Sequence, residues 1–356
     1  MTQPILSLCG VARSYRSRKT SGWGWTTVHA AVDVNLEVHE GETLAIVGES
    51  GSGKSTLAKL LLMLQPPSGG DVEFRGVSLA RLDKLQRDEY RRQVQAVFQD
   101  PASSLNPMMT VERTLGYIIR RHELASPANE RAFILKQLAS VGLTPAEQYL
   151  GRFPHQLSGG QQQRIAIARA MMLEPKVIIA DEPLSSLDMS IQAQVLRLMM
   201  DLRERTNVGF VVISHDLGAM QSIADRTAVM YRGRIVEIGA DVYTRPAHPY
   251  TRLLLDARLA PDPRAGRIRS LAADRAVPPP ALTGAGGCGF RNRCASATER
   301  CATEEPALRP VAGGATQVAC HRAEELMGLV AAHASKMPSP SREGTVPTLV
   351  NKGERQ

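Results

Sequence analysis

The residues most plainly suited to chemistry form a glycine-rich stretch, GESGSGKS, at residues 48–55. Glycines at this spacing let consecutive backbone N–H groups turn toward a phosphate, and a helix that starts there adds positive potential. The lysine would contact the β- and γ-phosphates, and the final serine would bind Mg²⁺. The expected nucleotide-binding residues of this loop are Gly48, Glu49, Ser50, Gly51, Ser52, Gly53, Lys54, Ser55 and Thr56.

Two adjacent carboxylates follow a second apolar run, in KVIIADEP at residues 176–183. A buried strand would deliver them to the carboxyl edge of a sheet, where ligands bind in such folds. We expect Asp181 to hold Mg²⁺ together with Ser55, directly or through water. Glu182 would then polarise the attacking water as the catalytic base.

The elements around these residues indicate an α/β fold. The short apolar runs TLAIV (43–47), KVIIA (176–180) and FVVI (210–213) suit parallel strands buried on both faces. A helix is expected over STLAKLLLML (55–64), and the prolines of QPPSGG end it. A helix-rich section over residues 101–163 interrupts the strand pattern, so we interpret it as an inserted subdomain.

The stretch QLSGGQQQRIAIARA, residues 156–170, resembles the LSGGQ signature of ABC-type ATPases. The resemblance implies a P-loop NTPase (RecA-like) core with an antiparallel β subdomain and a helical signature subdomain. It also implies a head-to-tail dimer in which the signature of one subunit contacts ATP on the other. The residues with this role are expected to be Leu157, Ser158, Gly159, Gly160, Gln161 and Asp188.

Three further positions match the same family, and one departs from it. Gln99 in VFQDP would contact Mg²⁺ and link the site to the helical insert, and His215 in VVISHD would contact the γ-phosphate, so both join Glu182 as catalytic residues. Tyr15 would stack on adenine, although Trp23 or Trp25 could take that place. Gln162 stands where arginine is usual, and we expect a surface position without consequence.

Five stretches narrow the resemblance: FQDPASSLNPMMTV, FPHQLSGGQ, IQAQVLRLM, IADRTAVMYRGRIVEIG and HPYTRLLLDA. Over about residues 5–322 the chain resembles the ATPase subunits of oligopeptide, dipeptide and nickel importers, and SLDMSIQAQVL favours the second of their two paired subunits. The implied partners are two membrane permeases docking near residues 101–117, a second ATPase subunit in a heterodimer, and an extracytoplasmic solute-binding protein. The solute stays open among dipeptides, oligopeptides, glutathione-like molecules and nickel complexes.

Charge and hydropathy restrict the location and the partners. The 43 basic and 35 acidic residues give +8, spread in short runs, which favours a solvated surface over a nucleic-acid groove. No apolar run approaches the ~18–20 residues of a membrane span, and the N-terminus lacks the pattern of a signal peptide. We expect a peripheral protein on the cytoplasmic face of the inner membrane and no nucleic-acid partner. The alternative is a soluble ABC-type ATPase that serves a nucleic-acid or multi-enzyme complex.

Four cysteines, Cys288, Cys294, Cys301 and Cys320, lie near the C-terminus with five, six and eighteen residues between them. Thiols stay reduced in the cytoplasm, so a metal site is favoured over disulfides. Zinc sites favour fewer residues between paired cysteines, and irregular spacing between four cysteines suits an iron–sulfur cluster at least as well. The resemblance implies a [4Fe–4S] cluster, so we rank it first, zinc second and free thiols third. His321 is expected to be a neighbour of the cluster, and Cys9 a buried apolar residue near a strand.

Three parts are therefore predicted. Residues 1–257 form the ABC ATPase domain with its helical insert at 101–163, and residues 258–330 form a Pro- and Gly-rich linker followed by the cysteine-containing C-terminal extension. Residues 331–356 are polar, contain proline, and are expected to be a disordered tail.

Overall fold

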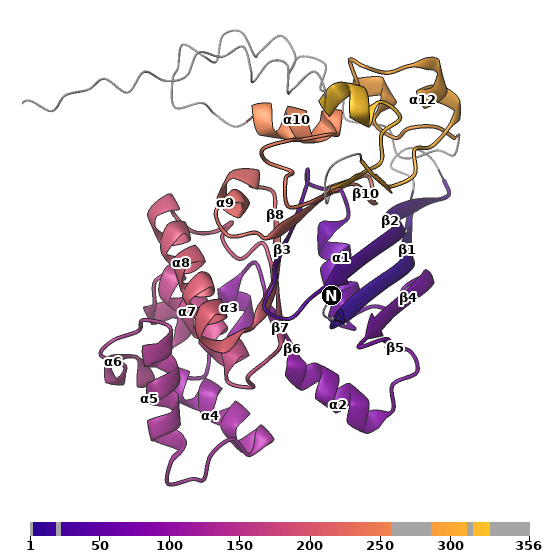
Figure 1. Cartoon of the computed structure of the whole chain (residues 1–356). Helices are drawn as coiled ribbons and strands as arrows, with labels where there is room; N and C mark the ends of the chain where they lie inside the picture. Colours follow the sequence, from indigo (N-terminus) through magenta and orange to yellow (C-terminus); the bar gives the residue numbers. More distant parts are fainter. Residues whose placement is uncertain (1–2, 19–22, 258–285, 312–315, 328–356) are drawn as a thin grey trace, which may run out of the picture.

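The computed structural model describes residues 3–18, 23–257, 286–311 and 316–327. Two β-sheets, a group of helices and a C-terminal extension make up this part of the chain (Figure 1). The α/β fold class predicted from the sequence is confirmed. Most of the expected linker and all of the expected tail at 331–356 lie outside the described residues.

The larger sheet has eight strands in the order β11-β12-β10-β9-β3-β8-β7-β6. Strands β6, β7, β8, β3 and β9 run parallel to one another, as expected for the three apolar runs, which form β3, β7 and β8, whereas β10 is antiparallel to β9. The strands are β3 (Thr43–Val47), β6 (Val94–Val97), β7 (Val177–Asp181), β8 (Gly209–Ser214), β9 (Arg226–Tyr231), β10 (Arg234–Gly239), β11 (Arg309–Pro310) and β12 (Gln317–Val318).

The smaller sheet is antiparallel, with the order β2-β1-β4-β5. Its strands are β1 (Leu6–Arg18), β2 (Trp25–Val38), β4 (Gly69–Phe74) and β5 (Val77–Ser78). Leu6 and Leu8 of β1 point into the core, and Cys9 follows on the opposite face and is exposed. The expectation that Cys9 is buried was therefore wrong, because side chains alternate between the two faces of a strand.

The side chains of strand β3 point alternately into two hydrophobic clusters, one on each face of the large sheet. Leu44 and Ile46 of β3 pack with helix α1 (Lys54–Leu61) and the antiparallel sheet, whereas Ala45 and Val47 face the helical group. All four are fully buried. A strand buried on both faces needs this continuous apolar run, which is why TLAIV predicted it.

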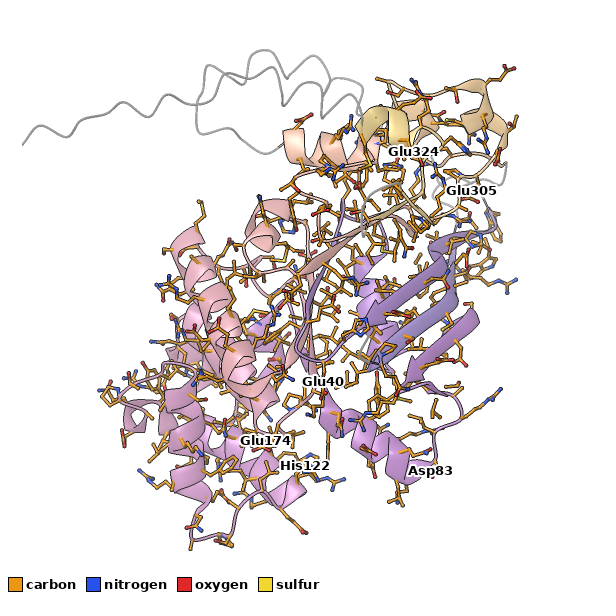
Figure 2. All side chains as sticks on the ribbon, viewed as in Figure 1. Glu40, Asp83, His122, Glu174, Glu305 and Glu324 are labelled. Carbon is orange, nitrogen blue, oxygen red and sulfur yellow. The ribbon has the colours of Figure 1, made fainter. Side chains whose placement is uncertain are left out.

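Helices cover the other face of the sheet (Figure 1). They are α3 (Pro101–Ser104), α4 (Val111–His122), α5 (Glu130–Ser140), α6 (Glu147–Leu150), α7 (Gly159–Met171), α8 (Met189–Thr206), α9 (Leu217–Gln221) and the 3₁₀ turn η1 (Pro154–Gln156). Helix α2 (Lys84–Gln93) precedes β6 and begins at Asp83, whose carboxylate accepts a bond from the Gln86 N–H at 2.8 Å (Figure 2). No helix of the described segments is both long and apolar enough for a membrane crossing.

The C-terminal extension completes one edge of the large sheet. Strand β12 pairs with β10, where Val318 lies opposite Glu237, and β11 pairs with β12. Helix α10 (Pro249–Asp256), the 3₁₀ turn η3 (Arg291–Arg293) and helix α12 (Glu299–Thr303) lie near this edge (Figure 1). An ion pair of 2.6 Å from Arg234 of β10 to Glu305 further ties the extension to the sheet (Figure 2).

Candidate functional site

The phosphate loop runs from β3 to α1 and needs glycine at two positions. Gly48 and Gly53 have φ angles of 153° and 107°. A Cβ atom on Gly48 would lie 2.2 Å from the Met230 carbonyl oxygen, and one on Gly53 would lie 1.9 Å from the Ala30 carbonyl oxygen. A side chain at Gly48 or Gly53 would collide with the backbone of strand β9 or β2, so both strands are in direct contact with the loop.

Lys54 lies inside the curve of this loop. Its ammonium is buried and donates to the carbonyl oxygens of Gly48 at 2.8 Å and Glu49 at 2.9 Å. Burial lowers the pKa of Lys54, and Glu182, Asp181 and Glu49 oppose that shift. The ammonium is thus held by weak neutral acceptors, which phosphate oxygens can replace with stronger charge-assisted bonds.

Ser55 and Asp181 meet at the carboxyl end of β7. The Ser55 hydroxyl donates to the Asp181 carboxylate over 3.0 Å. Burial raises the pKa of Asp181, and the bond from Ser55 opposes that shift. A hydroxyl and a carboxylate form the hard oxygen donor set that Mg²⁺ prefers, so these residues fit the ion.

Glu182 and His215 follow the neighbouring strands β7 and β8. Glu182 has a φ of 47°, and its N–H donates to the Ile213 carbonyl oxygen over 3.0 Å, which fixes this unusual backbone. Its carboxylate lies 3.5 Å from Nδ1 of His215, whose side chain is 60% exposed. Gln99 is exposed two residues beyond β6, and Val97 of β6 pairs with Ala180 of β7, so Gln99 and Glu182 leave the sheet at the same edge.

The predicted signature begins helix α7. Ser158 is its N-cap: the hydroxyl accepts from the Gln161 N–H at 3.3 Å, and the Ser158 N–H donates to the Gln161 side chain at 3.0 Å. A Cβ on Gly160 would lie 2.7 Å from a methyl group of Ile191 on α8. Helix α7 packs in the hydrophobic cluster between the large sheet and the helices, whereas α1 packs in the cluster next to the antiparallel sheet. The signature and the phosphate loop of one chain therefore lie on different faces of the large sheet.

Gln162 holds this region in place, which the sequence reading missed. Its amide donates to the carbonyl oxygens of Pro154 at 2.9 Å and Leu157 at 3.1 Å. The expected surface position is half-buried, because the side chain folds back over the turn that enters α7. Asp188 precedes α8 and is exposed.

The aromatic candidates for adenine differ in their distance from the loop. Ala30 of β2 touches Gly53, and Val28, two residues earlier, pairs with Tyr15. Trp25 lies five residues before Ala30, or roughly 17 Å along the strand. Trp23 is fully exposed, and the Tyr15 hydroxyl donates to Gln65 at 2.5 Å.

The four C-terminal cysteines gather around one small void of about 10 Å³, lined also by His321. Within the described ranges, no group of three or more ligating side chains is arranged to hold a metal ion, so this arrangement does not support a cluster. Burial raises the pKa of the Cys288, Cys294 and Cys320 thiols, that of Cys320 to about 11. Nε2 of His321 lies 3.0 Å from the Glu304 carbonyl oxygen.

Two family models match the chain, "ABC transporter" over residues 31–185 and "Oligopeptide/dipeptide transporter, C-terminal region" over residues 236–301. The chain is 44% identical to the di/tripeptide transport ATP-binding protein DppF of Pseudomonas aeruginosa, over 92% of this chain and 100% of that protein. The chain belongs to the ABC transporter ATP-binding proteins. It is also 41% identical to the dipeptide transport ATP-binding protein DppF of Escherichia coli, over 91% of this chain and 96% of that one.

Solved structures of ABC transporter ATP-binding proteins share the fold. The cassette MJ0796, in a dimeric post-hydrolysis state with ADP and phosphate, is 30% identical with a TM-score of 0.57, over 66% of this chain and 97% of that one. CbiO1 of Clostridium perfringens, part of the ABC transporter complex cbiONQ, is 26% identical with a TM-score of 0.59. The match covers 76% of this chain and 100% of that one. As a family member, this chain is an ATPase, and ATP with Mg²⁺ is its expected ligand.

Two residues of this ABC ATPase that the sequence reading missed reach the phosphate loop. The Tyr250 hydroxyl accepts from the Glu49 N–H at 2.9 Å, and Arg293 forms two bonds of 2.9 and 2.8 Å with the Glu49 carboxylate. Tyr250 lay within the stretch HPYTRLLLDA that marked the family, but its contact with a loop 201 residues earlier had no local signal.

We propose that Tyr15 stacks on adenine in preference to Trp25. Tyr15→Ala should weaken ATP binding about tenfold, since base–aromatic stacking contributes ~1–3 kcal/mol. Trp25→Ala, the matched control on the neighbouring strand, should leave the affinity unchanged. Calorimetric titration with MgATP checks both, and a loss confined to Trp25→Ala would reverse the assignment.

Proposed function

We propose that this protein is the ATP-hydrolysing subunit of an ABC importer for dipeptides or oligopeptides. One observation carries the proposal: full-length similarity to peptide-transport ATP-binding proteins that includes both the ATPase region and the oligopeptide/dipeptide-type C-terminal region. Motor subunits of this type act beside permeases, so the proposal places the chain peripherally on the cytoplasmic face of the inner membrane. Two permeases and an extracytoplasmic solute-binding protein complete the transporter.

The chemistry is assigned to residues at the carboxyl edge of the sheet. Lys54 and the loop N–H groups bind the phosphates, and Ser55, Asp181 and Gln99 hold Mg²⁺, which neutralises phosphate charge. Glu182 accepts a proton from the water whose oxygen attacks the γ-phosphorus, while the bond to the β-phosphate oxygen breaks. His215, 3.5 Å from that carboxylate, orients it and contacts the γ-phosphate.

A second subunit is needed to complete each site in this proposal. The signature residues from Leu157 to Gln161, with Asp188, would contact ATP held by the opposite phosphate loop. The exposed start of α7 supports this role, because Ser158 and Gly159 are solvent-accessible and free N–H groups of a helix N-terminus attract phosphate. A related ATPase chain, forming a heterodimer, is the proposed partner.

Glu182→Gln tests the base. The amide keeps the shape of the side chain but accepts no proton, so turnover should fall by about 10²–10⁴-fold while ATP binding is retained. In the proposed dimer, the variant should accumulate a closed, ATP-bound pair that gel filtration detects. Glu204→Gln, an exposed change on α8, is the control. Normal phosphate release by Glu182→Gln would remove the assignment.

Co-purification tests the importer. Tagged protein extracted from membranes in mild detergent should bring two multi-span permeases and a second ATPase, identified by mass spectrometry. Recovery with soluble enzymes or with nucleic acid would instead favour the alternative, an ABC-type ATPase of a soluble complex. A steep loss of nucleic-acid binding with salt would support that alternative further.

We also retain a metal as the proposed occupant of the cysteine cluster, with [4Fe–4S] first and zinc second. What supports it is the grouping of four thiols in one place; the described arrangement does not itself form a metal site, so binding requires the thiols to rearrange and lose their protons. Anaerobically purified protein should then hold about four irons and four sulfides, lost in Cys301→Ser but kept in Cys9→Ser. About one zinc would favour the second alternative, and no metal would leave free thiols.

A further inference from the structure

Glu49 of the phosphate loop is held at each of its polar groups. Its N–H donates to the Tyr250 hydroxyl at 2.9 Å, and its carbonyl oxygen accepts from Lys54 at 2.9 Å. Its carboxylate accepts two bonds from Arg293, of 2.9 and 2.8 Å. Lys54 belongs to the loop and its helix, whereas Tyr250 lies on helix α10 near the end of the ATPase domain and Arg293 lies in the C-terminal extension.

Arg293 has a fixed position of its own. It ends the turn η3, directly before Cys294, and its side chain is only 14% exposed. Its guanidinium lies 5.6 Å from the Phe290 ring and 5.9 Å from the Tyr231 ring. A two-bond ion pair between such pre-positioned groups loses little side-chain entropy, unlike most exposed pairs.

The aromatic residues beneath Arg293 connect the extension to the back of the loop. Phe290 of the extension packs against Tyr231 and Tyr250, with ring centroids 5.3 and 5.5 Å away. Tyr231 follows Met230, whose carbonyl oxygen occupies the place of a Gly48 side chain. A movement of the extension would therefore reach the loop through packing as well as through hydrogen bonds.

Tyr250 is fixed by the start of α10. Its ring is fully buried, and its N–H donates to Nδ1 of His248 at 3.0 Å. The buried Glu237 carboxylate on β10 accepts from the N–H groups of Ala247 at 2.6 Å and His248 at 3.0 Å. The hydroxyl that accepts the Glu49 N–H is thus tied to strand β10, which also pairs with β12 of the extension.

We propose that the cysteine-containing extension positions the phosphate loop for ATP, with Arg293 of the extension and Tyr250 of the adjoining helix α10 as the two positioning residues. Glu49 and Gly48 are the residues whose carbonyl groups hold Lys54, so displacement of Glu49 would misplace the lysine that binds phosphate. The extension thereby sets the affinity of the motor for ATP. This inference rests on ATP binding at the loop, a part of the proposed function, and not on which solute is transported.

The test compares one substitution in two backgrounds of the full-length chain, with MgATP titrated by calorimetry. Arg293→Gln should raise the Kd for ATP about three- to tenfold in the otherwise native protein. In a Glu49→Gln background the same substitution should change Kd less than about twofold, because the partner carboxylate is already gone. An equal effect in both backgrounds would mean that Arg293 acts through its charge or the general fold, and would overturn the proposal.

Further variants separate positioning from stability. Arg300→Gln removes the same charge from the extension, but Arg300 forms its ion pair with Glu304 and not with the loop residue Glu49, so the Kd of this variant should match that of the native protein. Arg293→Lys should recover part of the affinity, and Tyr250→Phe, which removes only a hydroxyl, should weaken ATP binding without a charge change. Steady-state turnover should show a raised KM with kcat nearly unchanged, as expected for lost binding. An unchanged Kd in both Arg293→Gln and Tyr250→Phe would refute the inference, whereas failure of the native chain to bind ATP would count against the proposed function itself.

Discussion

The tight approach of two backbone carbonyl groups to the phosphate loop is the constraint on which the rest of the site depends. The Met230 and Ala30 carbonyl oxygens stand where side chains at Gly48 and Gly53 would be. The loop is therefore pressed between strand β9 of the large sheet and strand β2 of the small one. Both sheets must be in place for the loop to keep the curve that surrounds the Lys54 ammonium.

The parallel order of the large sheet supplies the other half of the chemistry. Strands β6, β7 and β8 are neighbours that point the same way, so the residues that follow them meet at one edge. That order brings Glu182 within 3.5 Å of His215 and leaves Gln99 just beyond the same edge, although the chain separates the three widely. Asp181, the last residue of β7, meets Ser55 from the helix that follows the loop. Strand order thus places the residues proposed for hydrolysis at one edge of the sheet, and the helix after the loop adds Ser55.

The extension is best understood as part of the ATPase edge and not as an appendage. Strand β12 continues the sheet beyond β10, and Phe290 and Arg293 pack behind the phosphate loop. This arrangement gives a structural use to a segment that carries four cysteines and little apolar surface of its own. The aromatic contacts of Phe290 with Tyr231 and Tyr250 join the extension to the residues behind the loop.

Local pattern was enough to determine the strands TLAIV, KVIIA and FVVI, the glycine-rich loop and the two carboxylates, since each depends on near neighbours in the chain. It failed where a side chain's partner is remote or its direction depends on neighbouring strands. The Cys9 side chain points to the exposed face of β1, and the Gln162 amide bonds to the Pro154 carbonyl oxygen. Composition reveals neither the exposure of Cys9 nor the partner of Gln162. The hydrogen bonds that Glu49 forms with Tyr250 and Arg293 join residues that are 201 and 244 positions apart in the chain, respectively. Only the tertiary structure decided them, because such contacts exist only once the sheet has brought the extension to the loop.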